Sequence, residues 1–211
     1  MNETKNVRVL AHSAIRIEGE KTVYIDPFHL KDEPHDADLI LITHEHYDHL
    51  SPEDIARAAK ETTWFVLPKT CREAARKAGL PQDRLLYLAP GESAKILEVP
   101  VEAVPAYNVG KLFHIRSRGW LGYVVTLNGL RYYIAGDTDD NEDVRKVRCD
   151  VALLPVGGKY TMTAKEAAGL ANALRPAAAV PTHYGDIVGD AEAPKTFAAL
   201  LDPAIFCDTA R

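Results

Sequence analysis

Histidine and aspartate side chains are concentrated in one short stretch, residues 43–50, which reads Thr-His-Glu-His-Tyr-Asp-His-Leu. His44 and His46 are two residues apart, so in extended backbone their side chains point to the same side. Neutral imidazoles together with a carboxylate are ligands that suit zinc, iron or manganese. With Asp48 and His49, four such groups fall within six residues, which favours two adjacent metal ions over one. The alternative is a solvated polar turn that happens to be rich in histidine.

Two further candidate ligands follow predicted strands far away in the sequence. Asp137 comes directly after a strand and Gly136, and a glycine lets the backbone approach its neighbours closely. His183 comes after a strand that ends near Val180. Both lie where a strand gives way to a loop, the usual place for ligands in sheet-based folds. Taken alone, Asp137 is also explained as a turn aspartate and His183 as a capped or core histidine; combined with the cluster, both are expected ligands.

Short strands and helices alternate around these residues. Apolar or alternating runs predict strands at 7–10, 14–17, 21–25, 39–42, 63–67, 85–88, 151–154 and 177–180, and strand-rich stretches over 94–104 and 122–134. Cap residues and spacing predict helices from Ser51 to about Lys60, and over 69–78, 163–174 and 194–201. The dipeptide Asn128-Gly129 between apolar residues predicts a hairpin. This order of elements predicts two sheets with helices packed outside them, and a single parallel sheet would not need the strand-rich middle.

Length and composition indicate one globular domain over residues 1–211. Hydrophobic residues make up 46% and charged residues 26%, both near the average for soluble chains. The net charge of −5 argues against nucleic acid or an anionic membrane as the main partner. Cys71, Cys149 and Cys207 form no paired-cysteine pattern, which suggests a reducing compartment. With a polar N-terminus and no apolar run near the ~20 residues of a membrane span, we expect a cytoplasmic protein.

These motifs resemble those of the metallo-β-lactamase fold family of metal-dependent hydrolases. The match comprises His44-x-His46-x-Asp48-His49, then Gly136-Asp137-Thr138, then His183 after a late strand. The early residues 11–14 and Asp26-Pro27, together with residues 155–163, are similar to the subgroup near the ascorbate-6-phosphate lactonases. The resemblance covers nearly the whole chain and is specific for the fold, but poorly specific for the substrate. It implies an α/β (α+β) fold, the four-layer αβ/βα sandwich, with the site at one edge of the two sheets.

The resemblance also implies a set of roles. One metal ion would take His44 and His46, a second would take Asp48, His49 and His183, and Asp137 would bridge them. His12 could touch a metal-bound group or the substrate, and Asp26 would accept a hydrogen bond from a ligand imidazole. Tyr107, Trp120 and Tyr160 could line a pocket, although a half-buried aromatic side chain is the commoner explanation.

The chain departs from the family pattern at the first metal ion. A third histidine usually completes that ion's ligands, in a Pro-Ala-x-His stretch in the subgroup, but here the stretch ends in Asn108. Three outcomes are open: His114, six residues on, is the ligand; Asn108 or water fills the position and weakens the first ion; or one ion binds tightly beside Asp48, His49 and His183. His114 could equally contact substrate or lie on the surface. We favour a site for two ions of uneven affinity.

The resemblance implies a metal-dependent hydrolase in which a metal-bound hydroxide cleaves a small-molecule ester, lactone, amide or phosphoester. Zinc, as one or two ions, is the expected cofactor, with manganese or iron as alternatives. Asp48 or Asp137 would move the proton, and the chain has no Gly-x-Ser-x-Gly segment to supply a serine nucleophile. Lys159, after two glycines, could meet an anionic group, although such a lysine is more often merely exposed.

Two other functions are kept as alternatives. A nucleic-acid phosphodiesterase of this fold usually needs an added arm and a basic surface, and 211 residues with a charge of −5 offer neither. A non-catalytic metal-binding or redox member is disfavoured by the intact His49 and His183. We therefore expect a small-molecule substrate and no nucleic-acid or membrane partner, and assembly into a homo-oligomer is left open.

Overall fold

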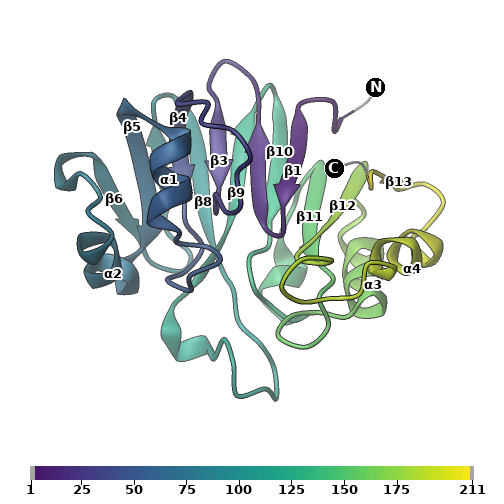
Figure 1. Cartoon of the computed structure of the whole chain (residues 1–211). Coiled ribbons are helices and arrows are strands. Elements are labelled where there is room, and N and C mark those ends of the chain that lie inside the picture. The colour runs from purple at the N-terminus through teal and green to yellow at the C-terminus, as the bar shows by residue number, and fades with distance from the viewer. Residues whose placement is uncertain (1–2, 210–211) are drawn as a thin grey trace.

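Two β-sheets pack face to face in the computed structural model, which describes residues 3–209 (Figure 1). The first sheet has the order β1-β2-β3-β4-β5-β6, formed by β1 (Val7–Ala11), β2 (Ala14–Ile17), β3 (Val23–Ile25), β4 (Ala37–Leu41), β5 (Ala59–Pro68) and β6 (Leu85–Leu88). The second sheet has the order β13-β12-β11-β10-β9-β8-β7, formed by β7 (Ser93–Ile96), β8 (Val99–Pro105), β9 (Leu121–Leu127), β10 (Leu130–Ile134), β11 (Val151–Pro155), β12 (Ala178–Thr182) and β13 (Phe206–Cys207). Both sheets are mixed, because β3 to β6 and β10 to β13 run parallel while the remaining neighbours are antiparallel.

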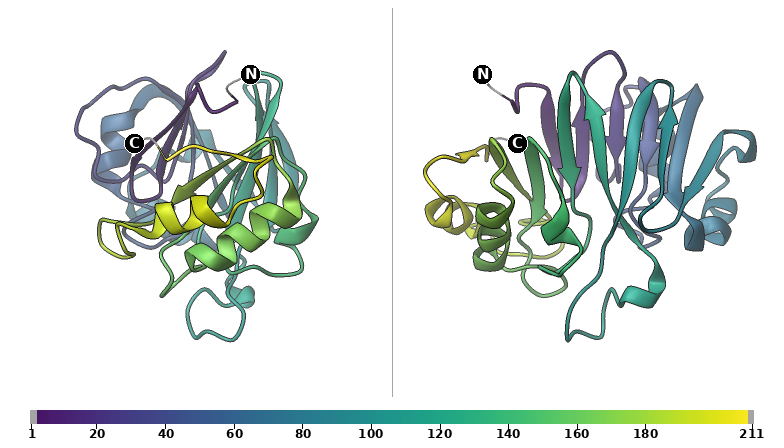
Figure 2. Two further views of the ribbon diagram at one scale, coloured as in Figure 1. Left: turned by 90° about the vertical axis from the view of Figure 1, so that its right-hand side faces the viewer. Right: turned by 180° about the vertical axis from the view of Figure 1, so that it is seen from behind.

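Helices cover the outer face of each sheet (Figure 2). The first sheet carries α1 (Pro52–Ala58) and α2 (Arg72–Lys77), and the second carries α3 (Ala164–Leu174) and α4 (Ala193–Leu200). Short 3₁₀ turns lie at Lys69–Cys71, Gln82–Arg84, Arg116–Arg118 and Val144–Lys146. The predicted four-layer αβ/βα sandwich is therefore confirmed. Within residues 3–209, none of the helices has the length and apolar character that a membrane span requires.

The strands divide their side chains between two apolar layers, because successive residues of a strand point to opposite faces. In β4, Leu39 and Leu41 enter the core between the sheets, whereas Ile40 packs in the core that includes helix residues of α1 and α2. In β11, Leu153 enters the core between the sheets and Leu154 packs with α3. Both faces of these strands are buried, which explains why they read as continuous apolar runs in the sequence.

Local signals in the sequence set most element boundaries. The capping box is present at α3, where the Glu166 N–H donates to Thr163 Oγ1 over 3.2 Å and the Thr163 N–H donates to the Glu166 carboxylate over 2.7 Å. Asn128 and Gly129 both have positive φ, as a two-residue type I′ hairpin requires. The prediction that the first helix runs to about Lys60 is wrong. The helix ends at Ala58, because Ala59 pairs with Ala37 and the chain joins the sheet as β5.

The turns and strand ends at one edge of the sandwich carry the candidate residues, and this edge lies at the bottom of Figure 1. The loop over residues 106–120, between β8 and β9, extends beyond that edge. Two glycines allow close packing there. A Cβ at Gly136, whose φ is +65°, would lie 2.9 Å from the Leu121 carbonyl oxygen, and one at Gly157 would lie 2.8 Å from His183 Nδ1. The expectation that Gly136 permits a close backbone approach is confirmed.

Candidate metal centre

Loops from both sheets bring eight histidine and aspartate side chains together. The cluster after β4 supplies four of them, Asp137 follows β10, His183 follows β12, His12 lies in the turn between β1 and β2, and His114 lies on the 106–120 loop. Three groups of these residues have ligand atoms that all lie within 4.8 Å of one another: His44, His46 and His114; His12, Asp48, His49 and His183; and His44, His49 and Asp137. The sequence-predicted candidates, apart from Asn108, therefore meet at one edge of the sandwich.

The first group contains the histidine whose place the sequence left open. His44 Nε2 lies 2.9 Å from His46 Nδ1, and the His114 ring centroid lies 5.3 Å from that of His44 and 5.1 Å from that of His46. The structure thus brings His114 next to the other two rings. The Asn108 amide lies instead on the Nδ1 side of the His114 ring, at 3.3 Å, and donates to the Tyr160 carbonyl oxygen over 2.6 Å.

The second group is buried and includes His12, which the sequence placed at this edge without assigning it to an ion. Asp48 Oδ2 lies 3.3 Å from His12 Nε2 and 3.5 Å from His49 Nε2. The His12 and His183 rings are 3.9 Å apart, and the His183 N–H donates to the His12 carbonyl oxygen over 2.9 Å. Three imidazoles and one carboxylate therefore face a common point.

The Asp137 carboxylate lies between the two groups. Its Oδ2 is 3.2 Å from His114 Nε2, which belongs to the first group. Its Oδ1 is 3.2 Å from His183 Nε2 and 3.5 Å from His49 Nε2, which belong to the second. One oxygen thus faces each group, which is the placement that a bridging ligand needs.

Several of these buried atoms have no partner in hydrogen-bonding geometry among the described residues. They are Nε2 of His12, His49, His114 and His183, and Oδ1 of Asp137. A buried polar atom without a partner costs about 1–3 kcal/mol, so such atoms are rare unless an ion or water satisfies them. Nitrogen and carboxylate donors at short range are the donor set of zinc and similar divalent ions. The residues present therefore fit a metal centre.

The electrostatics of the centre prepare the side chains for ligation. Burial lowers the pKa of His12, His44 and His46, which keeps these imidazoles neutral. Burial alone would raise the pKa of Asp48, but the His12 and His49 imidazoles beside its Oδ2, at 3.3 and 3.5 Å, outweigh burial and hold that pKa low. For Asp137, the charges of His183 and His49 likewise outweigh burial and hold the pKa well below its usual value. Both carboxylates are therefore ionised.

Asp26 and Thr43 hold the ligand imidazoles from behind. His49 Nδ1 lies 2.7 Å from Asp26 Oδ2, and that carboxylate also accepts hydrogen bonds from the Thr43 N–H and Thr43 Oγ1, over 2.8 and 2.6 Å. Thr43 Oγ1 lies 3.0 Å from His44 Nδ1. Asp26 thus faces the imidazole of His49, a candidate ligand, as a residue that orients that ring would. Although burial lowers the pKa of His49, the charges of Asp137 and Asp26 outweigh it and raise that pKa well above its usual value.

The backbone at the centre is strained in four places. His12, Asp26, His114 and His183 have φ values of 44°, 46°, 53° and 58°, in the left-handed region. Such conformations are uncommon for residues other than glycine, and they gather at functional sites where surrounding contacts hold them. The strain therefore coincides with the candidate ligands and their support.

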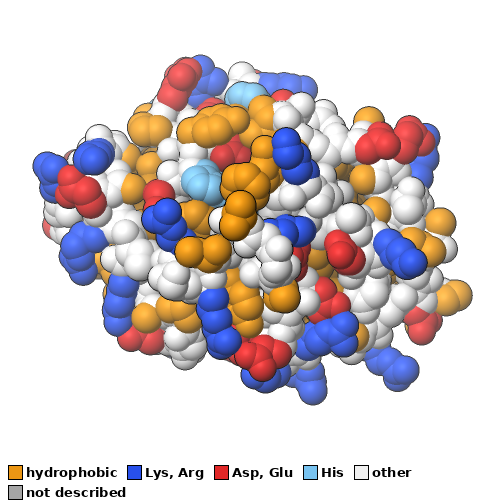
Figure 3. Space-filling view, turned by 90° about the horizontal axis from the view of Figure 1, so that it is seen from below, with side chains coloured by type: hydrophobic (Ala, Val, Ile, Leu, Met, Phe, Trp, Pro, Cys, Tyr) orange, Lys and Arg blue, Asp and Glu red, His pale blue; other side chains and the backbone are white. Residues whose placement is uncertain are grey.

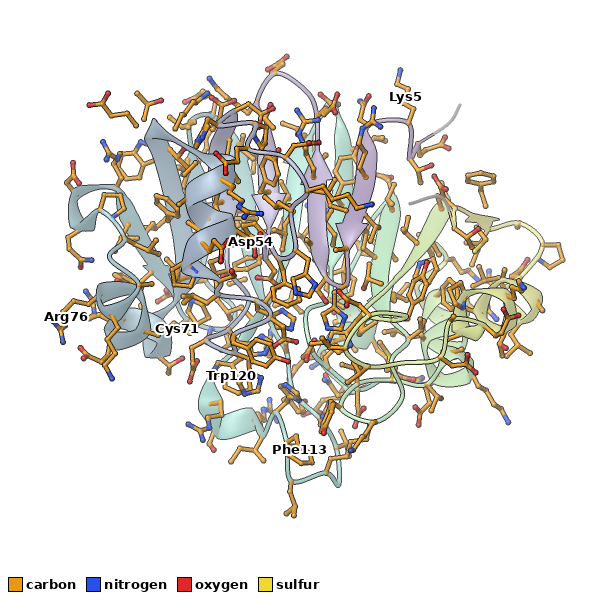
Figure 4. All side chains as sticks on the ribbon, in the orientation of Figure 1. Lys5, Asp54, Cys71, Arg76, Phe113 and Trp120 are labelled. Atoms are coloured by element: carbon orange, nitrogen blue, oxygen red, sulfur yellow. The ribbon has the colours of Figure 1, made fainter. Side chains whose placement is uncertain are left out.

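Glu45, which sequence reasoning missed, lies beside the first group together with Trp120, which the sequence named as a possible pocket residue. Trp120 Nε1 donates to Glu45 Oε2 over 2.6 Å, and Cys71 Sγ donates to the same oxygen over 3.0 Å. The Trp120 ring centroid lies 4.7 Å from that of His44 and 4.8 Å from that of His46. Trp120 and Cys71 are labelled in Figure 4. The alternation of the cluster was a signal for this, because Glu45 must point away from the side that His44 and His46 share.

Comparison with known proteins agrees with this geometry. The profile described as "Beta-lactamase superfamily domain" matches residues 6–183. The chain belongs to the beta-lactamase superfamily. A superfamily relative from Thermococcus onnurineus, named "UPF0173 metal-dependent hydrolase", is 34% identical, and the alignment covers 92% of this chain and 91% of the relative. A relative of the same name from Archaeoglobus fulgidus is also 34% identical, over 83% of this chain and 81% of its own.

Solved structures extend the comparison. A crystal structure from Parabacteroides distasonis, described provisionally as a metal-dependent hydrolase, has a TM-score of 0.82 and 32% identity, and covers 96% of this chain and 90% of that chain. A metallo hydrolase from Ignicoccus hospitalis, at 24% identity and a TM-score of 0.75 over 96% and 94% of the chains, shares the fold. The relatives and the His/Asp centre support a metal-dependent hydrolase of the metallo-β-lactamase fold.

Proposed function

We propose that the chain hydrolyses a small-molecule ester, lactone, amide or phosphoester with two divalent metal ions, for which zinc is the best match. One ion would be held by His44, His46 and His114, and the other by Asp48, His49 and His183, with His12 beside them. The observation that carries the proposal is the place of Asp137, whose two oxygens face histidines of different groups at 3.2 Å. The histidine-rich donor set is the reason for preferring zinc.

Each part of the centre has a task in this reaction. A divalent cation held by these residues would supply a water of lowered pKa, toward ~7, and a positive charge to polarise the carbonyl or phosphoryl oxygen of the substrate. Asp48 is ionised, so its carboxylate can accept the proton of the attacking water. When the bond to the leaving group breaks, that proton passes to the leaving atom and the carboxylate is regenerated. His12, neutral and 3.3 Å from Asp48 Oδ2, orients this carboxylate.

Metal analysis of purified protein tests the site. His46→Ala and Asp137→Ala should each bind less zinc than the parent, because each removes a donor that the chain does not replace. His35→Ala is the matched control, since the His35 side chain is 54% exposed and bonds to the Ala59 carbonyl oxygen. Unchanged metal content in both site variants would overturn the proposed centre.

A substrate screen with the zinc-loaded protein tests the activity. 4-Nitrophenyl acetate, a γ-lactone, bis(4-nitrophenyl) phosphate and a short RNA represent the competing classes. Turnover of an acyl or small phosphoester substrate that is lost in Asp48→Asn supports the proposal. Cleavage of RNA alone would replace it with a nucleic-acid phosphodiesterase, and complete inertness of the loaded protein would replace it with a metal-binding role.

A further inference from the structure

The candidate metal centre opens into a cavity of about 470 Å³, within the range of small-molecule sites. The floor of this cavity is formed by side chains of the centre, namely His46, Asp48, His114, Asp137 and His183. A substrate atom that reaches the floor therefore meets both groups of ligands. The rest of the substrate must lie against the walls, so the walls decide which substrates fit.

The walls of this cavity are apolar. They are formed by Tyr47, Phe113, Tyr160, Ile187 and Val188. Phe113 and Tyr160 come from different loops, and their rings meet edge to face with centroids 4.9 Å apart. Tyr47, Phe113 and Ile187 remain 67%, 51% and 38% exposed. The view from below shows hydrophobic side chains gathered beside a histidine in the middle of this face (Figure 3). Exposed apolar side chains gathered in this way mark a binding surface.

Among the described residues, the lining of the cavity includes no lysine or arginine side chain, so it carries no fixed positive charge. Nearby cations have other partners. Lys111 donates to Asp139 and to the Thr161 carbonyl oxygen over 2.6 and 2.8 Å, and Arg116 pairs with two acidic side chains. Lys159 lies over the Tyr160 ring, 5.0 Å from its centroid. A negatively charged group beyond the scissile bond would therefore meet apolar walls and two carboxylates.

We propose that the substrate is a neutral ester or lactone whose acyl part carries an apolar chain or ring, seated against Phe113, Tyr160 and Ile187. This inference rests on the proposed hydrolase function and narrows it. Water adds to the carbonyl carbon, the acyl C–O bond breaks, and the proton goes to the alkoxide, so an acid and an alcohol are formed. One negative charge develops, at the floor. A phosphorylated substrate would carry further charge, and the walls hold no cation to pair with it.

A series of esters tests the proposal with zinc-loaded protein. The values of kcat/KM for 4-nitrophenyl acetate, butyrate, hexanoate and octanoate should rise with chain length, by up to about fourfold for each CH₂ that becomes buried. The half-ester 4-nitrophenyl succinate, which is about as long as the butyrate to hexanoate esters but anionic, should be at least about tenfold poorer than the hexanoate. A kcat/KM that does not change with chain length, or that is higher for the succinate than for the hexanoate, would contradict the proposed apolar substrate. It would not contradict the proposed hydrolase function.

Two lysine substitutions test whether the preference for apolar acyl chains depends on the cavity wall. Ile187→Lys should flatten the dependence on chain length and improve the succinate, because it places a cation in the cavity lining. Leu200→Lys is the matched control, since Leu200 is similarly exposed, at 45%, but belongs to α4 and not to the cavity lining. It should behave as the parent. An unchanged profile in Ile187→Lys, or a succinate preference that Lys159→Ala removes, counts against the proposal.

Binding of hydroxamates separates the inference from the function. If the loaded protein hydrolyses neither these esters nor any substrate of the screen above, the proposed function has failed, and calorimetry still tests whether the cavity walls bind an apolar chain. Octanohydroxamate should bind at least about tenfold more tightly than acetohydroxamate, because its chain buries apolar surface. Ile187→Lys should reduce this difference. Equal affinities of the two hydroxamates would by themselves contradict the proposal that the cavity walls bind an apolar chain.

Discussion

Replacement of Asp26 by asparagine tests whether the layer behind the metal centre sets its affinity. In the parent, Asp26 Oδ1 accepts a hydrogen bond from the Thr43 N–H, and Oδ2 accepts from Thr43 Oγ1 and faces His49 Nδ1 at 2.7 Å. His49 Nδ1 thus carries a proton, so Nε2 is the nitrogen that can give up its proton to bind an ion. Asparagine keeps the acceptor for the Thr43 N–H but turns an NH₂ group toward both Thr43 Oγ1 and His49 Nδ1. The imidazole must then place its proton on Nε2, the atom that faces Asp48 and Asp137.

The size of the effect follows from this change of tautomer. Loss of a partner behind a ligand histidine lowers metal affinity about 10–100-fold, which corresponds to about 1.4–2.7 kcal/mol. The metal-free protein should lose little stability, because asparagine has the same shape and removes a carboxylate that is only 1% exposed and whose pKa is raised by burial. We therefore expect weaker zinc binding with a nearly unchanged melting temperature.

Competition with a chromophoric chelator measures the affinity, and thermal unfolding of the metal-free protein measures the stability. Asp38→Asn is the matched control: Asp38 also accepts from a backbone N–H, that of Thr22, over 2.8 Å, but it lies at the start of β4, whereas the centre follows the end of that strand. Asp38→Asn should bind zinc as the parent does. Parental affinity in Asp26→Asn, or an equal loss in both variants, would refute the reasoning.

Three further results are expected. His114→Ala should reduce the zinc content from two ions toward one, measured by mass spectrometry of the metal, and two tightly bound ions would contradict its place in the first group. Gly157→Ala should lower activity about 100-fold, because its Cβ would lie 2.8 Å from His183 Nδ1, whereas Gly169→Ala in α3, with open space around its Cβ, should not. Zinc uptake at neutral pH should release protons and weaken as the pH falls, because the raised pKa of His49 keeps this residue protonated without metal. Calorimetry in buffers of different ionisation enthalpy measures that release, and no dependence on the buffer would speak against it.

The elements and part of the centre follow from local features of the sequence. Caps and turn residues set α3 and the β9–β10 hairpin, and buried apolar runs identify the central strands. Asp137 and His183 follow β10 and β12, which run parallel with β11 between them, so their ends share one edge of the second sheet. The cluster after β4 lies at the same edge, where the Leu121 N–H of β9 donates to the Thr43 carbonyl oxygen over 3.1 Å. Sequence reasoning therefore finds residues whose place depends on strand direction.

The positions of the His114 and His12 side chains depend on contacts between segments that are distant in the sequence. His114 lies on a long loop, where no spacing rule fixes a side chain, and its position is set by contacts: its carbonyl oxygen accepts from the Asn108 N–H over 2.8 Å, and its Nε2 lies 3.2 Å from Asp137. His12 lies in a turn of the first sheet and meets His183 of the second. Its position therefore depends on how the sheets pack, which no local pattern in the sequence encodes.

The packing of the sheets also explains how the two groups of ligands come about. The first sheet contributes His12, His44, His46, Asp48 and His49, and the second contributes His114, Asp137 and His183. Neither sheet alone completes a group. The two halves are joined beside the centre by backbone hydrogen bonds, from the Leu121 N–H to the Thr43 carbonyl oxygen over 3.1 Å and from His183 to His12 over 2.9 Å. These hydrogen bonds and the apolar core between the sheets involve no metal ion. The fold therefore positions the candidate ligands, and a bound metal ion would supply the chemistry.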